Sequence, residues 1–281
     1  MFERLSPTRI RAIREGLSIA GVICLAYFWS RGWPNPGIDS FASWNVDASA
    51  PYDFNGDPYQ FGAFRYSPAA AQAFQLLNWL PWEAFFWTWL GILFGAVLYI
   101  GRWWGVALLI FPPLVYSLWT GNIDVLLAAA IVAGFRWPGA WAIVLLTKVT
   151  PGIGLLWFAL RGEWRSFATA LGTTFIVVGV SFALAPGLWF DWPRELLSIQ
   201  QNDATQPLPL PLRIAGAALL VVWGERTDRR WTVIVAAFIA IPQVSLRAAA
   251  MLVGTVPLLG LPIRWAFLDH PVHRGDAAGD A

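Results

Sequence analysis

The amino-acid sequence predicts an all-α, polytopic membrane protein. Hydrophobic residues make up 57% of the 281 positions and charged residues only 13%. The apolar residues come in long runs that short polar breaks divide, which is typical of transmembrane helices rather than of a water-soluble core. Because the hydrocarbon part of a bilayer needs roughly 20 apolar residues per helix, we expect a bundle of about ten transmembrane helices.

The expected spans follow one another through a single domain, residues 1–281. Pro112 and Pro113 interrupt the fourth span and Pro151 interrupts the sixth. Proline removes backbone hydrogen bonds that lipid cannot replace, so these broken helices should face protein or a cavity. The sixth span is either one long helix or two half-helices that meet near Lys148. The spans are expected at residues 16–30, 67–80, 82–100, 104–119, 122–135, 137–160, 166–188, 208–223, 231–241 and 247–263.

Basic residues at the ends of the spans predict the orientation. Four arginines precede the first span, which lacks a small-residue cleavage site and is therefore expected to remain as an uncleaved helix. By the positive-inside bias, residues 1–15 and the tail 266–281 are cytoplasmic. Two long loops, residues 31–66 and 189–206, then face outward together. The arginines are spread over membrane flanks instead of forming one basic stripe, so nucleic acid is not an expected partner.

Asp39, in the first outward loop, is a candidate catalytic residue. An amphipathic stretch that includes Phe41 and Trp44 follows it and is compatible with a short helix on the membrane surface. Two interpretations of Asp39 stay open. It could cap that helix, or it could act as a general base that accepts a proton from an attacking hydroxyl.

The same loop does not match the sequence pattern of a calcium-binding loop. Asp53, Asn55 and Asp57 have the spacing that opens a calcium loop, but Pro58 replaces the sharp-turn glycine and Phe64 replaces the bidentate glutamate. A turn explains them better. Both histidines lie in the polar tail without zinc-type spacing. No glycine-rich phosphate loop and no Ser/His/Asp set is present, so we expect no metal and no cofactor.

Lys148 is the only lysine, beside 18 arginines, and lies inside an apolar run. An ammonium near the middle of a span costs roughly 2.5 to 3.5 kcal/mol, so such a group usually faces an interior cavity and a partner. One interpretation is structural, an ion pair with Asp124 or a side chain that reaches an interface. The other is functional, because a lysine is a compact charge that binds phosphate oxygens.

The second outward loop offers further polar groups, from Arg194 to Asn202 and Asp203. These side chains could contact a sugar or an acceptor, or they could belong to a solvated loop.

The order of these motifs resembles polyprenol-phosphate-mannose-dependent mannosyltransferases, glycosyltransferase family 87 of the GT-C class. The motifs are an Asp in the first outward loop, "PYDF" at 51–54, "GAFRYSP" at 62–68, Gly121-Asn122, "KVTP" at 148–151, and the segment with Trp192 and Asn202. The resemblance extends from about residue 16 to 215. It implies a GT-C helical bundle whose site opens to the periplasmic or extracellular side, and an inverting transfer from a lipid-linked sugar phosphate.

The resemblance also implies roles for individual residues. Asp39 matches the catalytic Asp of the family and Lys148 the Lys of its K-x-x-P element, while Tyr66 and Asn122 match positions that line the site. The sequence departs from the family near the C-terminus. A Pro-x-x-Trp element followed by histidines is replaced by "IPQVSLRAA" at 241–249, which contains Gln243, Ser245 and Arg247.

These observations predict a membrane glycosyltransferase of the bacterial plasma membrane. It would transfer a hexose, mannose in the family it resembles, from a polyprenyl-phosphate sugar to a glycolipid or cell-envelope glycan. Asp39 would take the proton, and Lys148, with Arg65 or Arg194, would hold the phosphate. Two alternatives remain: a transporter or lipid flippase with Lys148 in the substrate path, and a catalytically inactive scaffold that tolerates Asn at position 39.

Overall fold

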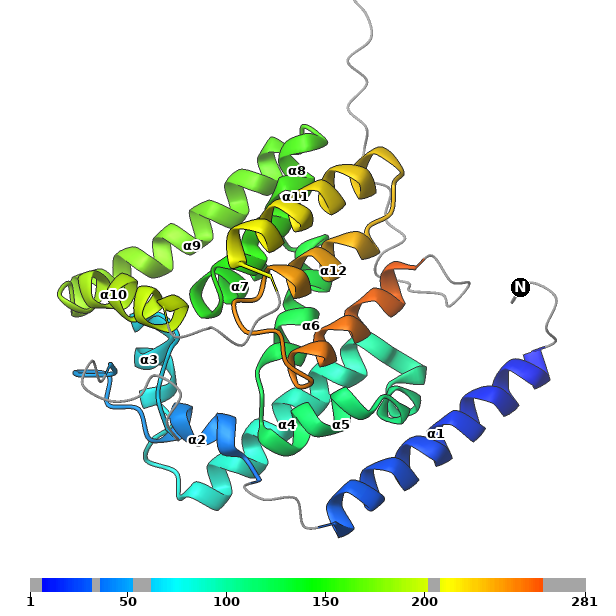
Figure 1. Ribbon diagram of the computed structural model, residues 1–281. Coiled ribbons are helices and arrows are strands. Elements are labelled where there is room, and N and C mark those ends of the chain that lie inside the picture. The colour runs from blue at the N-terminus through cyan, green and yellow to red at the C-terminus, as the bar shows by residue number, and fades with distance from the viewer. Residues whose placement is uncertain (1–6, 32–35, 53–61, 202–207, 260–281) are drawn as a thin grey trace, which may run out of the picture.

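The computed structural model describes residues 7–31, 36–52, 62–201 and 208–259, and within them every regular element is a helix (Figure 1). The predicted all-α fold is confirmed. In chain order the α-helices are α1 (Pro7–Ser30), α2 (Ile38–Trp44), α3 (Pro68–Gln75), α4 (Trp82–Gly101), α5 (Pro112–Thr120), α6 (Asp124–Gly134), α7 (Trp141–Thr147), α8 (Leu156–Leu160), α9 (Trp164–Leu184), α10 (Leu188–Gln201), α11 (Leu210–Arg226) and α12 (Trp231–Ala240). The 3-10 helices are η2 (Arg102–Trp104), η3 (Val106–Ile110), η4 (Pro138–Ala140), η5 (Thr150–Leu155) and η6 (Ala248–Leu258).

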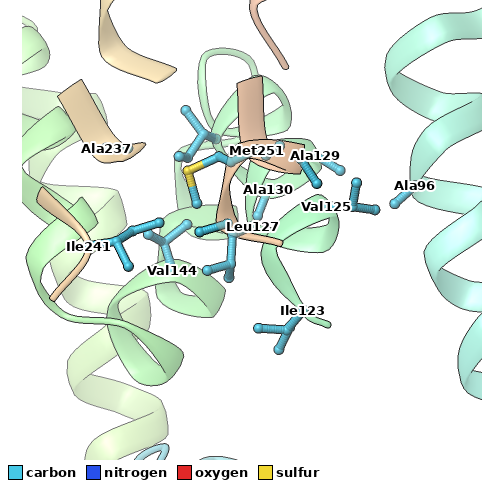
Figure 2. Close-up of a cluster of buried hydrophobic side chains, with 14 of the residues drawn as sticks. Ala96, Ile123, Val125, Leu127, Ala129, Ala130, Val144, Ala237, Ile241 and Met251 are labelled. Atoms are coloured by element: carbon cyan, nitrogen blue, oxygen red, sulfur yellow. The ribbon is translucent and has the colours of Figure 1, made fainter. Parts of the chain in front are cut away.

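Helix α6 forms the centre of the fold. It is apolar on all sides, and a helix of that kind is expected in a protein interior. It packs against α4, α7 and η6. Figure 2 shows the side chains that meet there. The labelled side chains include Ala96 of α4, Val144 of α7, Ala237 of α12 and Met251 of η6. Val125, Leu127, Ala129 and Ala130 belong to α6, Ile123 directly precedes it, and Ile241 directly follows α12.

The expected number of about ten spans is not confirmed. Within the described part of the chain, two helices are long and apolar enough to cross a membrane, Trp82–Trp104 and Trp164–Leu184. The pair α5 and α6 meets the same criterion together but is bent by 111° at its break. The described part of the chain also contains shorter apolar helices of 10–17 residues, Pro138–Thr147, Thr150–Leu160, Trp231–Ala240 and Ala248–Leu258.

The segment around Lys148 consists of two half-helices, which answers the question that the sequence left open. Helix α7 ends at Thr147, and Lys148 follows it in an extended conformation. Pro151 lies in the first turn of η5, where its missing N–H is not needed. The predicted interruption at Pro112 is also present, because Phe111 is extended and α5 begins at the proline.

The second outward segment differs from the loop that we predicted. Residues 188–201 form α10, and Leu188, Trp192 and Glu195 are its buried residues. This spacing is that of one face of an α-helix. The many polar residues and Pro193 suggested a loop, but burial of one helical face stabilises the helix. Asn202 and Asp203 lie outside the described residues, as do Asp53, Asn55 and Asp57 of the rejected calcium loop and the histidines of the tail.

The short helix predicted after Asp39 is present as α2, but its buried side is polar. Ser40 and Ser43 are its buried residues, and the helix packs against α3, α4 and α5. Gly37 precedes it in the left-handed conformation, with φ of 73°, and its N–H donates to the carbonyl of Trp119, 2.8 Å away. The N-terminal end of α2 is thereby tied to the C-terminal end of α5.

Candidate functional site

Asp39, Asn122, Asp124, Lys148 and Arg247 are joined by consecutive ion pairs and hydrogen bonds, which we call the Asp39 network. They come from α2, from the α5–α6 connection, from the first residue of α6, from the break after α7, and from the residue before η6. Three of the five residues were predicted to act together.

The carboxylate of Asp39 is held on both oxygens. Oδ1 accepts from Nη1 of Arg247 at 2.6 Å, and Oδ2 accepts from Nδ2 of Asn122 at 3.0 Å. The N-cap of α2 is Gly37, and the structure shows no side-chain capping bond there. The capping interpretation of Asp39 is therefore wrong. Its carboxylate points to the α5–α6 connection and to the C-terminal segment.

The conformation of Gly121 places Asn122. Gly121 adopts φ of 69°, and a Cβ added to it would lie 2.4 Å from Oγ of Ser40 on α2. Only glycine fits both the left-handed backbone and this close approach. The carbonyl of Gly121 accepts from Nε1 of Trp89 at 2.8 Å, and the N–H of Asn122 donates to the carbonyl of Ser117 at 2.9 Å. The Gly-Asn motif therefore has a geometric reason: it lets α2 approach the α5–α6 connection closely.

Asp124 and Lys148 form the buried part of the network. Nζ of Lys148 donates to Oδ1 of Asp124, and the two side chains are 19% and 1% exposed. The backbone N–H of Asp124 also donates to Oδ1 of Asn122 at 2.9 Å, which fixes the orientation of that amide. Asp124 begins α6 and Lys148 ends α7, so each charge lies at the helix terminus that favours its sign. The ion pair between Lys148 and Asp124, which was one of the two interpretations of Lys148, is thus present. Because an ammonium has three donors, the pair does not by itself decide whether Lys148 also binds phosphate.

Arg247 belongs to a segment, residues 241–247, that another arginine holds in place. Arg213 on α11 is buried and donates to the carbonyls of Leu208, Ile241 and Pro242 at 3.1, 2.6 and 2.6 Å. In the same segment, Oε1 of Gln243 accepts from Nη1 of Arg65 at 3.3 Å. The stretch that replaces the histidine element thus contributes Gln243 and Arg247 to the site.

Tyr66 lies in the loop before α3, on the last turn of α7. The N–H of Ser67 donates to the carbonyl of Leu146 at 3.2 Å, and the carbonyl of Tyr66 accepts from the hydroxyl of Tyr52 at 2.9 Å. Burial raises the pKa of the Tyr66 phenol well above its ordinary value, and the charges of Asp124 and Asp39 raise it further. The phenol therefore stays protonated at neutral pH and can donate a hydrogen bond.

Among the described residues, Arg194 is a predicted site residue that no contact joins to the network. Nη1 of Arg194 pairs with Oδ1 of Asp191 on the same helix at 3.3 Å, and its side chain is 73% exposed. Asn202 lies outside the described residues. Nη1 of Arg65 donates to Oε1 of Gln243, in the segment that also contains Arg247. In the part of the chain that the structure describes, no group of three or more His, Cys, Asp or Glu side chains is arranged to hold a metal ion.

The sequence analysis did not assign a site role to Arg247, Gln243 or Asp124. A signal for Arg247 was available, because it is the only charged residue between positions 231 and 263. The argument that singled out Lys148, one charge within a long apolar stretch, applies equally to Arg247. Its partner could not be found in this way, since Asp39 lies 208 positions earlier.

The family model described as "Glycosyltransferase family 87" matches residues 64–273, most of the chain. The match confirms the resemblance that the motifs predicted and continues beyond residue 215, where we placed its end. It includes Tyr66, Asn122, Lys148 and Arg247, whereas Asp39 precedes it. No curated protein and no solved structure matches the chain.

Proposed function

Because this chain belongs to glycosyltransferase family 87, a family of membrane glycosyltransferases, we propose that it transfers a hexose from a polyprenyl-phosphate sugar to a hydroxyl group. The acceptor is a glycolipid or a cell-envelope glycan, and the configuration at the anomeric carbon is inverted. The observation that carries the proposal is the Asp39 network, in which a carboxylate that is partly exposed, 21% at its side chain, pairs with Arg247 and is linked through Asn122 and Asp124 to Lys148.

In the proposed reaction Asp39 is the general base. The acceptor oxygen attacks the anomeric carbon, its proton passes to a carboxylate oxygen of Asp39, and the bond between the anomeric carbon and the phosphate oxygen breaks. The electron pair of that bond leaves with the polyprenyl phosphate, and Asp39 later releases the proton to water. A positioned base of this kind contributes about 10²- to 10⁴-fold to a rate. Asn122 orients the carboxylate through its 3.0 Å hydrogen bond.

The cations stabilise the leaving group. A phosphodiester donor has one negative charge, and the departing polyprenyl phosphate gains a second, so a fixed positive charge near the phosphate lowers the energy of the transition state more than that of the ground state. We assign this role to Lys148, whose ammonium Asp124 holds in place, with support from Arg65. Arg194 and Asn202 are assigned to binding of the acceptor.

The remaining assignments rest on the resemblance and on the charge pattern of the sequence. Mannose is the proposed sugar, the bacterial plasma membrane the proposed location, and the periplasmic or extracellular side the proposed side of the site. The whole chain is proposed to act as one domain. The arginine-rich flanks at residues 161–165 and 224–230 support a cytoplasmic position for the opposite end.

The experiment that tests the proposal uses the purified full chain in lipid nanodiscs with a panel of radiolabelled polyprenyl-phosphate sugars and an envelope glycolipid extract. The variants are Asp39→Asn and Lys148→Ala. Asp228→Asn is the matched control, because Asp228 also pairs with an arginine at 2.6 Å but lies outside the network. We expect transfer by the wild type, normal transfer by the control, and a loss of at least about 10²-fold in Asp39→Asn.

Transfer that survives Asp39→Asn in a folded variant would remove Asp39 from the role of base. If no donor yields product, the transporter alternative gains weight, since the breaks at residues 121–123 and 148–149 meet in the network and broken helices are typical of substrate paths. Movement of a fluorescent lipid across liposomes that contain the protein would then test that alternative. A chain that does neither would fit the inactive scaffold.

A further inference from the structure

Lys148 and Arg247, the two cations of the Asp39 network, differ in how deeply their carboxylate partners are buried. Lys148 pairs with a carboxylate that is 1% exposed. If Lys148 left that partner, a buried charge would remain without compensation, which is energetically costly. Arg247 and Asp39 have side chains that are 33% and 21% exposed. If Arg247 left Asp39, water could reach the carboxylate, and Asn122 would still donate to its Oδ2.

The contact with Arg247 also hinders Asp39 in its proposed role as the general base. In this structure each carboxylate oxygen accepts a hydrogen bond from the protein, one of them from a charged donor at 2.6 Å. The charged donor occupies an acceptor position of Oδ1 on the partly exposed side of the carboxylate. Asp39 acts as a base most effectively once Arg247 has moved.

We propose that Arg247 is exchanged between Asp39 and the phosphate of the lipid-linked donor. Without donor, Arg247 holds Asp39. When donor binds, the guanidinium turns to the phosphate, whose oxygens match its planar fork better than a single carboxylate oxygen does, and Asp39 becomes free for the acceptor hydroxyl. This inference rests on the proposed function, because it takes the lipid phosphate as the competing anion.

The surroundings of Arg247 confine the motion to its side chain. Arg213 fixes the carbonyls of Ile241 and Pro242, and η6 begins directly after Arg247 and packs on α6 and α12. The backbone on both sides is thus held, while a long, partly exposed side chain remains between them. The exchange makes donor binding a condition for activating the base.

The proposal is tested by binding rather than by transfer, in a double-mutant cycle. The ligand is polyprenyl phosphate without sugar, titrated into nanodiscs that contain the wild type, Asp39→Asn, Arg247→Gln or both changes together. Polyprenol, which lacks the phosphate, is the ligand control. Arg161→Gln is the protein control, because its Nη1 also lies 2.6 Å from an aspartate oxygen. A melting curve of each variant shows that it is folded.

If Arg247 is shared between the two anions, removing the carboxylate releases it to the phosphate. We therefore expect Asp39→Asn to bind polyprenyl phosphate about tenfold more tightly than the wild type, as a charge-assisted hydrogen bond would give. Arg247→Gln should bind about tenfold more weakly, and the double variant should equal Arg247→Gln. Arg247→Lys keeps the charge without the fork and should retain part of the gain from Asp39→Asn. Arg161→Gln should bind as the wild type does.

Each other result contradicts the exchange in a distinct way. If Asp39→Asn does not tighten binding, Arg247 is not shared. If it tightens binding equally in the presence of Arg247→Gln, the gain is the loss of one negative charge and Arg247 has no part in it. If the wild type binds polyprenyl phosphate no better than polyprenol, the donor class itself is wrong, and the proposed function falls together with the exchange.

Discussion

Two arginine–aspartate pairs, at distant places in the fold, have the same contact distance and different surroundings. Arg247 and Asp39 are joined at 2.6 Å, and so are Arg161 and Asp228. Arg161 lies after α8, also contacts Glu163 at 3.3 Å, and its guanidinium lies over the ring of Trp157. Asp228 is 74% exposed, in the turn between α11 and α12. Asp39 is instead linked through Asn122 to a second, buried pair.

The difference teaches that the distance within an ion pair says little about what the pair does. An exposed pair is screened by water and contributes about 0 to 1 kcal/mol to stability. A pair connected to buried charges cannot be changed without affecting those charges. The Arg161 pair connects surface turns, whereas the Arg247 pair is the accessible end of a network whose other end is buried.

The largest expected effect on stability comes from breaking the buried end of the network. Lys148→Met leaves Asp124 buried without its cation, which should cost about 3 to 5 kcal/mol. Arg161→Met leaves behind Asp228, which is 74% exposed and hydrated, so it should cost less than about 1 kcal/mol. Chemical denaturation of both variants in detergent, followed by circular dichroism, measures the difference.

A double variant sharpens this test. Lys148→Met combined with Asp124→Leu removes both charges, so it should recover a large part of the lost stability. If Lys148→Met costs no more than Arg161→Met, or if the double variant is less stable than the single one, the pair is not the buried, mutually dependent unit that the structure describes.

A smaller effect is expected from two glycines with the same backbone conformation. Gly121 in the network and Gly162 beside Arg161 both have φ of 69°, but a Cβ at Gly162 would meet only Nε1 of Trp164, at 4.0 Å. Gly162→Ala should therefore cost only the left-handed penalty, about 1 to 2 kcal/mol. Gly121→Ala adds a clash with Ser40 and should displace α2 together with Asp39.

Activity separates the two glycine variants more clearly than stability. Gly121→Ala should lower the transfer rate by at least about tenfold, since small misplacements of a reacting group are costly, and Gly162→Ala should leave it unchanged. Equal activities in the two folded variants would show that α2 does not need the close approach at Gly121.

The last expected effect concerns alkaline pH. The folded-state pKa of Tyr66 is raised by burial and by nearby carboxylates, while an unfolded chain ionises its phenols near pH 10. The stability that this neutral phenol contributes is complete below about pH 10 and is lost as pH rises further, by at most about 1.4 kcal/mol per pH unit. Tyr66→Phe should therefore lose less stability between pH 10 and 12 than the wild type. Identical losses in thermal melts would contradict the buried, neutral phenol.

The sequence predicted features that depend on local chemistry. Composition predicts the all-helical class, Pro112 and Pro151 predict the two breaks, and the unusual position of Lys148 predicts a partnered charge, which the structure provides in Asp124. Features that depend on distant packing were missed. Apolar runs do not show whether a short helix crosses a membrane or packs inside, and α10 appeared as a loop because its buried face contains a glutamate. Arg247 was missed as the partner of Asp39, because no local pattern joins residues so far apart.

The ion pair between Asp39 and Arg247 also sets a time order during biosynthesis. The two residues are 208 positions apart. At the usual rate of about 5 to 20 residues per second, a ribosome adds Arg247 about 10 to 40 s after Asp39. During that interval α2 emerges without the arginine that neutralises its carboxylate. The nascent polypeptide must therefore carry this charge at the membrane until its late partner inserts, and the site is complete only after the segment with Arg247 has been made.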